Sequence, residues 1–107
     1  MSAAKIKALN DAFRTSMTGG RVVTTVGVDA LPSDVKAIVI RRVATFTDFT
    51  ADNDPHGEHD FGNFEVAGQK FFWKIDYYDA AMQFGLEDPA DPAKTTRVLT
   101  IMLASEY

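Results

Sequence analysis

The side chains best suited to metal binding or acid–base chemistry lie together in one short stretch, residues 52–60. The candidate site residues in it are Asp52, Asp54, His56, Glu58, His59 and Asp60. Asp52, Asp54 and Gly57 match positions one, three and six of a calcium-binding loop. The match ends there, because position twelve, where calcium needs a bidentate carboxylate, is Asn63. We therefore do not expect an EF-hand.

Imidazole and carboxylate groups also suit zinc or manganese. An open site on His56, His59 and Asp60 would activate a water molecule for hydrolysis, with Asp76 or Asp79 as a more distant ligand. This makes a metal-dependent hydrolase or nuclease centred on residues 52–60 our alternative hypothesis. The competing interpretation is structural: His59 and Asp60 bond to backbone groups and hold the loop in place. We favour the structural interpretation and expect no cofactor.

Other common catalytic arrangements find no support in the sequence. The chain contains no cysteine, which excludes disulfides, thiolate nucleophiles and cysteine-based metal sites. No serine lies in a G-x-S-x-G motif, and Gly19-Gly20 alone is too little for a phosphate-binding loop. We therefore lean towards a protein that is not an enzyme.

A second candidate surface lies on the strand predicted over residues 70–78. Successive residues of a strand face opposite sides of the sheet. We expect one set to face the core, namely Phe71, Trp73, Ile75 and Tyr77. The other set mixes rings with charges and is a candidate binding surface, formed by Phe72, Lys74, Asp76 and Tyr78. Such a surface would suit a protein partner or a second copy of the chain in a homodimer.

Two helices are expected in the N-terminal half. The first, which Ser2 would cap and Gly19-Gly20 would end, is indicated by apolar residues at helical spacing, which are Ile6, Leu9, Phe13 and Met17. Its polar residues are expected mainly on the opposite, solvent-facing side, including Asn10, Asp11 and Arg14. The second helix is expected to begin with Ser33 as N-cap and to run to about Phe46. Its predicted buried stripe is Val35, Ile38, Val39, Val43 and Phe46.

Extended segments are predicted at residues 21–28, 61–67, 70–78 and 95–107. The middle two form a hairpin around Ala67-Gly68-Gln69, and the last is apolar on both faces, which indicates a central strand. Loops are expected at 47–60, ordered by the flanking Phe49 and Phe61, and at 86–93; residues 79–84 fit either a helical turn or an extended edge. The sequence thus predicts a single α+β domain over residues 1–107. Two helices pack on one face of a mostly antiparallel sheet of about four strands, in the order α-β-α-β-β-β.

The charge is unevenly distributed around a net value of −4. Residues 1–47 carry seven basic and three acidic side chains, whereas residues 48–107 carry four and twelve. No lysine or arginine lies between Arg42 and Lys70, so this region suits a basic partner or a cation. We do not expect direct nucleic-acid binding, although the basic N-terminal half keeps it as a third hypothesis. With no apolar signal or membrane-spanning segment in the sequence, we expect a cytoplasmic location.

Several stretches resemble a known family when taken in order. They are LNDAFR, GGRVVTTVGV, FTADNDPHGEHDFGNFEV, FFWKIDYYD and TTRVLTIMLASEY. The chain resembles a family of small uncharacterised alphaproteobacterial proteins, a domain of unknown function often encoded on plasmids and other mobile elements. The resemblance implies an accessory, plasmid-maintenance or anti-defence setting and carries no catalytic residues. Our leading hypothesis is a small non-enzymatic interaction protein that binds a protein partner through its acidic loop and aromatic sheet face.

Overall fold

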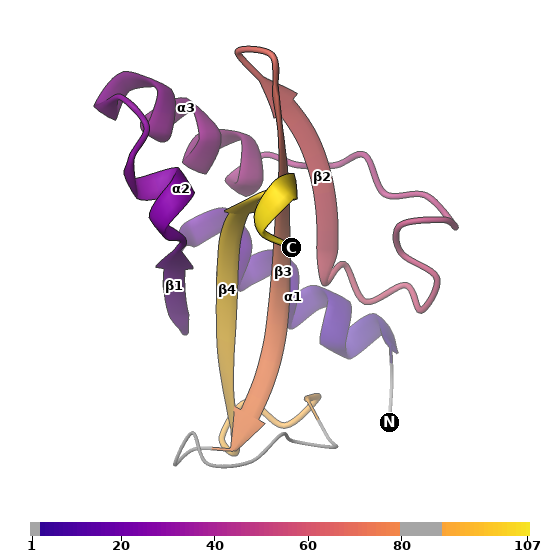
Figure 1. Cartoon of the computed structure of the whole chain (residues 1–107). Coiled ribbons are helices and arrows are strands. Elements are labelled where there is room, and N and C mark those ends of the chain that lie inside the picture. The colour runs from indigo at the N-terminus through magenta and orange to yellow at the C-terminus, as the bar shows by residue number, and fades with distance from the viewer. Residues whose placement is uncertain (1–2, 80–88) are drawn as a thin grey trace.

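The computed structural model describes residues 3–79 and 89–107, which form an α+β fold (Figure 1). The helices are α1 (Ala3–Ser16), α2 (Val26–Asp29), α3 (Ser33–Ala44) and the 3-10 turn η1 (Ala104–Glu106). The strands are β1 (Arg21–Thr24), β2 (Phe61–Val66), β3 (Gln69–Asp79) and β4 (Thr95–Leu103). The predicted class is confirmed, with α2 and η1 added to the expected elements. Ser2, and most of the segment predicted at 79–84, lie outside the described residues.

The sheet has the strand order β1-β4-β3-β2. Strand β3 is antiparallel to both β2 and β4, whereas β1 pairs with β4 in parallel. The mostly antiparallel sheet and the central position of β4 are therefore confirmed. The hairpin is also confirmed: Ala67 and Gly68 connect β2 to β3 with φ angles of 53° and 79°. Two successive positive φ angles are typical of the type I′ turn, whose twist matches that of the paired strands.

The two long helices cover one face of the sheet. Phe13 of α1 and Val39 and Val43 of α3 belong to the same buried cluster as Trp73 of β3 and Leu99 of β4. Figure 1 shows α1 crossing behind the sheet, while η1 lies in front of it. The expected core residues of β3, with Trp73 completely buried, do face the helices. The opposite sheet face carries no long helix within the described part of the chain.

The strand predicted over residues 21–28 is too long. The chain leaves the sheet after Thr24 and forms the single turn α2, which directs Val28 into the core and leaves Val26 84% exposed. The Glu106 carboxylate accepts hydrogen bonds from the Thr25 hydroxyl (2.6 Å) and the Gly27 backbone N–H (2.9 Å). These tertiary contacts at the first turn of α2 override the β propensity of the valines.

The ends of α3 and β4 also differ from the prediction. Pro32 occupies the N-cap of α3, so Ser33 is already helical and makes no capping bond. The helix ends at Ala44, and Ile38 is 50% exposed because the buried stripe follows Val39 and Val43 instead. Strand β4 ends at Leu103, not at residue 107. There the chain turns into η1, because the Leu103 N–H donates to the side chain of Glu106 (2.8 Å).

Candidate functional site

The acidic loop, which we define as residues 47–60, is held in one conformation by its own side chains. Asp54 is buried, and its Oδ1 accepts the backbone N–H groups of Glu58 (3.1 Å) and His59 (3.0 Å). Gly57 and His59 have positive φ angles of 67° and 54°, a conformation unusual for residues other than glycine. The polar bonds of Asp54 stabilise this backbone, so the expectation of an ordered loop is confirmed.

Asn10 of α1 attaches the acidic loop to the sheet. Its side chain is fully buried and donates to the Glu58 carbonyl (3.0 Å) and to the Tyr77 hydroxyl (2.8 Å). Its Oδ1 accepts from Nε of Arg97 (2.7 Å), which reaches it from β4. Burial raises the pKa of Tyr77 and lowers the pKa of Arg97. The expectation that Asn10 faces solvent is wrong, because these bonds satisfy its amide inside the protein.

Arg14 is the second α1 residue for which the expected solvent-facing position is wrong. Its guanidinium is buried and donates from Nη1 to the carbonyls of Val43 (2.8 Å) and Phe46 (3.0 Å) at the end of α3. Nη2 donates to Oδ1 of Asp11 (3.1 Å). The guanidinium thus lies at the C-terminal end of α3, which is the end of a helix that favours positive charge. The same group lies 5.1 Å from the Trp73 ring.

His59 connects the acidic loop to α1. Its Nδ1 lies 2.9 Å and 3.1 Å from the two carboxylate oxygens of Asp11, and its Nε2 lies 3.6 Å from Oδ2 of Asp54. The imidazole stacks on the Phe49 ring, with centroids 3.6 Å apart and planes 3° from parallel. Asp11 also accepts a hydrogen bond from Arg14, which in turn bonds to the end of α3. The Asp11 carboxylate therefore links the acidic loop to α3 through Arg14.

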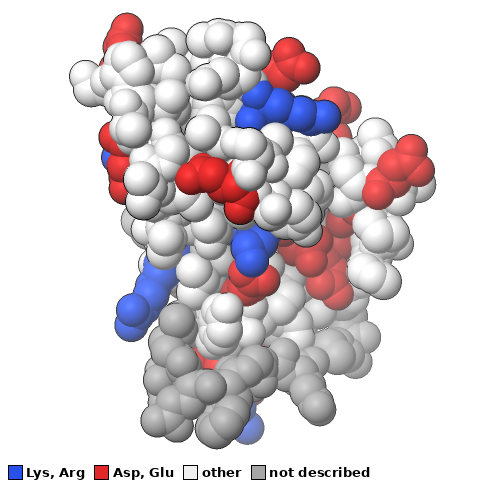
Figure 2. All heavy atoms as spheres, viewed as in Figure 1, with Lys and Arg blue, Asp and Glu red and all other residues white. Residues whose placement is uncertain are grey.

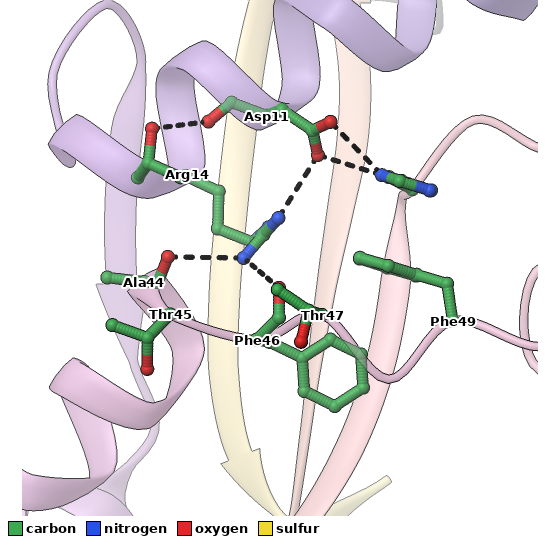
Figure 3. A pocket seen from close by; sticks show the side chains of 9 residues that line it. Asp11, Arg14, Ala44, Thr45, Phe46, Thr47 and Phe49 are labelled. Carbon is green, nitrogen blue, oxygen red and sulfur yellow. Dashed lines mark hydrogen bonds and ion pairs between the residues drawn. The ribbon is translucent and has the colours of Figure 1, made fainter.

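A pocket of about 510 Å³ opens beside these groups, and we call it the His59 pocket (Figure 3). Its lining residues are Asp11, Arg14, Thr15, Ala44, Thr45, Phe46, Thr47, Phe49 and His59. Figure 3 shows the Arg14 side chain reaching from α1 to the Ala44–Thr47 segment, while the Asp11 carboxylate points toward the side on which Phe49 lies. The volume lies within the range of small-ligand pockets. Most of the wall is apolar, and Asp11, whose side chain is 37% exposed, is its half-exposed anionic group.

The structure separates the residues singled out in the stretch 52–60. Asp52 and His56 are exposed, whereas Asp54 is buried within the loop. Glu58 accepts from the Tyr77 hydroxyl (3.3 Å). Burial, together with the charge of Glu58, raises the pKa of half-buried Asp60. Nε2 of His59 lies 3.6 Å from Oδ2 of Asp54, on the side facing α1.

The proposed metal ligands do not converge. Among residues 3–79 and 89–107, no group of three His, Asp or Glu side chains is arranged to hold a metal ion. Asp76 points to the opposite face of the sheet and pairs with Lys74 (Nζ–Oδ2 2.9 Å), which raises the pKa of that lysine. The geometry therefore gives the metal-dependent alternative no specific support.

The residues predicted on the second sheet face share that face in the structure. Phe72, Lys74, Asp76 and Tyr78 are all partly buried. The Phe72 ring packs against the rings of Phe61 and Tyr107, with ring centroids 5.4 Å and 5.1 Å apart. The C-terminal turn therefore lies over part of the aromatic surface.

The pocket residues that the sequence did not reveal are on α1 and in the loop: Asp11, Arg14 and Phe49. The sequence did carry a signal for the burial of their neighbour Asn10, which follows Ile6 by four residues and precedes Phe13 by three, on the apolar stripe of α1. No local pattern indicates that Asp11 meets His59, which lies 48 residues away.

Comparison with known proteins adds a family to this geometry. Residues 24–106 match the family described as protein of unknown function, DUF3768. The chain belongs to this family. The match spans the acidic loop, β2, β3 and β4 but leaves out α1, which contributes Asp11 and Arg14 to the His59 pocket. No curated protein and no solved structure matches the chain.

None of the helices in the described part of this DUF3768 protein has the length and apolar composition needed to cross a membrane.

Proposed function

We propose that this DUF3768 protein is a small non-enzymatic interaction protein that binds a basic surface of a partner protein through its acidic loop. The observation that carries the proposal is an ordered loop that presents carboxylates to solvent. Asp48 and Asp52 are exposed, while Asp54 is used inside the loop to hold its shape. In Figure 2 acidic side chains gather on the right, where Figure 1 places this loop.

An ordered loop suits recognition for two physical reasons. A surface already in its binding conformation loses less conformational entropy when a partner docks. Exposed charges of one sign also accelerate the encounter with an oppositely charged surface, an effect that salt weakens. The absence of Lys and Arg from residues 43–69 leaves these carboxylates without basic neighbours along the chain.

Two further parts of the proposal rest on other observations. The aromatic sheet face with Phe72 and Tyr78 provides a second contact surface on the same molecule, partly covered by Tyr107. The resemblance to alphaproteobacterial proteins of plasmids and mobile elements supports a role as an accessory or anti-defence protein acting on a host protein. We propose no catalytic step for this chain.

The test begins with capture of partners from the native host, followed by purification of the candidate and calorimetry with the pure proteins. The loop variant is the double reversal Asp48→Lys/Asp52→Lys. The matched control is Asp34→Lys/Glu65→Lys, which makes the same change in net charge at two exposed positions outside the loop. We expect the loop variant to bind at least about tenfold more weakly, mainly through a slower association rate, with an unchanged melting temperature.

The control variant should bind within about threefold of the wild type, and raising the salt concentration should weaken wild-type binding. Equal losses in both variants would mean that only net charge matters and would contradict a role for the loop. Unchanged binding by the loop variant, or a partner whose contact surface is acidic, would also contradict the proposal.

A further inference from the structure

We propose that the His59 pocket receives one basic side chain, a lysine or an arginine, from the partner protein. The aliphatic part of that side chain would pack on Phe46 and Phe49, and its charged end would meet the Asp11 carboxylate. This inference rests on the proposed function and names the chemical group that the partner inserts. Four features support it: the wall of the pocket, the free capacity of Asp11, the charge balance around it and the position of the pocket beside the exposed acidic residues.

The wall of the pocket fits an aliphatic chain that ends in a cation. Phe46 and Phe49 pack edge to face with ring centroids 5.0 Å apart, and Ala44 adds a small apolar surface. Lysine and arginine bury their methylene groups on such surfaces while the charged end stays polar and hydrated.

Asp11 has the capacity to bind another donor. A carboxylate offers about four lone-pair positions. Oδ1 accepts from Arg14 (3.1 Å) and from Nδ1 of His59 (2.9 Å), and Oδ2 lies 3.1 Å from the same ring nitrogen. The Oδ2 atom therefore retains a lone pair, and 37% of the Asp11 side chain is exposed.

The charge around the pocket favours a cation over an anion. Arg14 is positive, but its nitrogens Nη1 and Nη2 are bonded to backbone carbonyls and to Asp11. Its Nε atom is buried and is not offered to a ligand. An anion entering the pocket would face the carboxylate of Asp11, with that of Asp54 behind His59. A cation would replace part of its lost hydration by contact with Asp11.

The pocket and the exposed acidic positions also belong to one surface. Phe49 and His59 line the pocket and lie within the acidic loop, and Asp48 directly precedes Phe49. Asp48 itself lines a neighbouring cavity that shares the Thr45–Thr47 segment with the His59 pocket. A basic partner surface drawn to the loop would thus bring its side chains to the pocket mouth.

The inference is tested by titrating small probes into the ¹⁵N-labelled protein and following backbone amide shifts. n-Butylguanidinium and n-pentylamine represent the arginine and lysine side chains and distinguish between them. n-Pentanol carries a similar stem without charge, and pentanoate carries the opposite charge. We expect saturable shifts at residues 11–15 and 44–49 for at least one cation, with millimolar affinity as befits a probe of so few atoms. Pentanol should bind several-fold more weakly and pentanoate not at all.

Two variants probe the pocket itself. Asp11→Asn keeps an oxygen acceptor for Arg14 but removes the charge, so cation affinity should fall about fivefold or more while pentanol is unaffected. Thr47→Lys places a cation at an exposed position of the pocket lining and should block cation binding without touching the Asp11 contacts. Asp34→Asn is the control for loss of one exposed carboxylate outside the pocket.

The outcomes separate this inference from the proposed function. No shifts at 20 mM cation, shifts outside the pocket, or equal binding of pentanol would overturn the inference, whatever the loop reversals do to partner binding. Unchanged partner affinity in Thr47→Lys would overturn it as well. In contrast, Asp48→Lys/Asp52→Lys should leave pentanol binding in the pocket intact. If the partner bound this loop variant as tightly as the wild type, only the proposed role of the loop would be refuted.

Discussion

Removal of the buried Arg14 guanidinium should destabilise the protein far more than the loss of an exposed basic side chain. The substitution Arg14→Met retains much of the apolar stem and deletes the charged donors. It removes the Arg14 donor from the buried carbonyls of Val43 and Phe46. The Val43 carbonyl keeps the Phe46 backbone N–H (3.3 Å). It also frees Asp11 from one of its two partners on the pocket wall.

The magnitude follows from the burial and number of these bonds. A hydrogen bond to a charged group contributes about 1.5–3 kcal/mol, and a buried acceptor left without a donor costs about 1–3 kcal/mol. These contributions are not additive, because Nη1 of Arg14 serves several carbonyls at once. We therefore expect a loss of about 3–5 kcal/mol in the free energy of unfolding, as for other broken buried charge contacts. For a chain of this length that corresponds to a drop in melting temperature of roughly 12–25 °C.

Urea denaturation followed by tryptophan fluorescence measures this loss directly. Trp73 is the only tryptophan of the chain, and its ring lies 5.1 Å from the Arg14 guanidinium. Arg42→Met is the matched control, since Arg42 is exposed and donates a single bond to the Glu65 carbonyl (3.2 Å). The control should lose less than about 1 kcal/mol. A loss below about 1 kcal/mol for Arg14→Met, or equal losses in the two variants, would refute the reasoning.

Three further changes test other contacts. The Thr25 hydroxyl and two backbone N–H groups lower the pKa of Glu106. Its charged form therefore adds stability above the usual pKa of 4.5, and the gap in melting temperature between wild type and Glu106→Gln should close as pH falls through the lowered value. Burial raises the pKa of Asp60, so its charge costs stability as pH rises above the usual 3.8. Asp60→Asn should be at least as stable as the wild type at pH 7 in thermal melts. Gly62→Ala places a Cβ 2.4 Å from Nε1 of Trp73 and should cost about 1–3 kcal/mol in urea denaturation.

Each of these outcomes has a clear opposite. A gap for Glu106→Gln that persists unchanged at pH 3 would show that its carboxylate charge is irrelevant to the C-terminal turn. A less stable Asp60→Asn at pH 7 would mean that the charged carboxylate is needed. If the urea denaturation curve of Gly62→Ala matched that of the wild type, β2 would have to move away from Trp73 at no cost in the free energy of unfolding.

Much of the fold could be predicted because its signals are local. The alternation of Phe71 and Trp73 with Phe72 and Lys74 follows from strand geometry, and it predicted both faces of β3 correctly. The hairpin followed from Ala67-Gly68, where the chain needs positive φ angles. The errors arose where distant contacts override propensity. The valines near residue 26 have strand propensity, yet the Glu106 side chain stabilises a helical turn there.

The candidate site was only half predicted, and the reason is physical. The composition and turn residues of the stretch 52–60 indicated an ordered acidic loop, which the structure contains. The pocket beside it needs Asp11 and Arg14, which helical spacing alone placed on the solvent side.

The sequence by itself determined the α+β class, the central strands, the hairpin and the acidic character of the loop, because each depends on neighbours along the chain. Only the tertiary structure decided that Asn10 and Arg14 are buried and that Asp11 meets His59. A polar side chain can be buried only when partners replace its bonds to water. Those partners come from Tyr77 and Arg97 for Asn10, and from the end of α3 for Arg14. These partners lie far from α1 in sequence, so the spacing of Asn10 on the apolar stripe could hint at its burial, but no pattern within the helix could identify the partners.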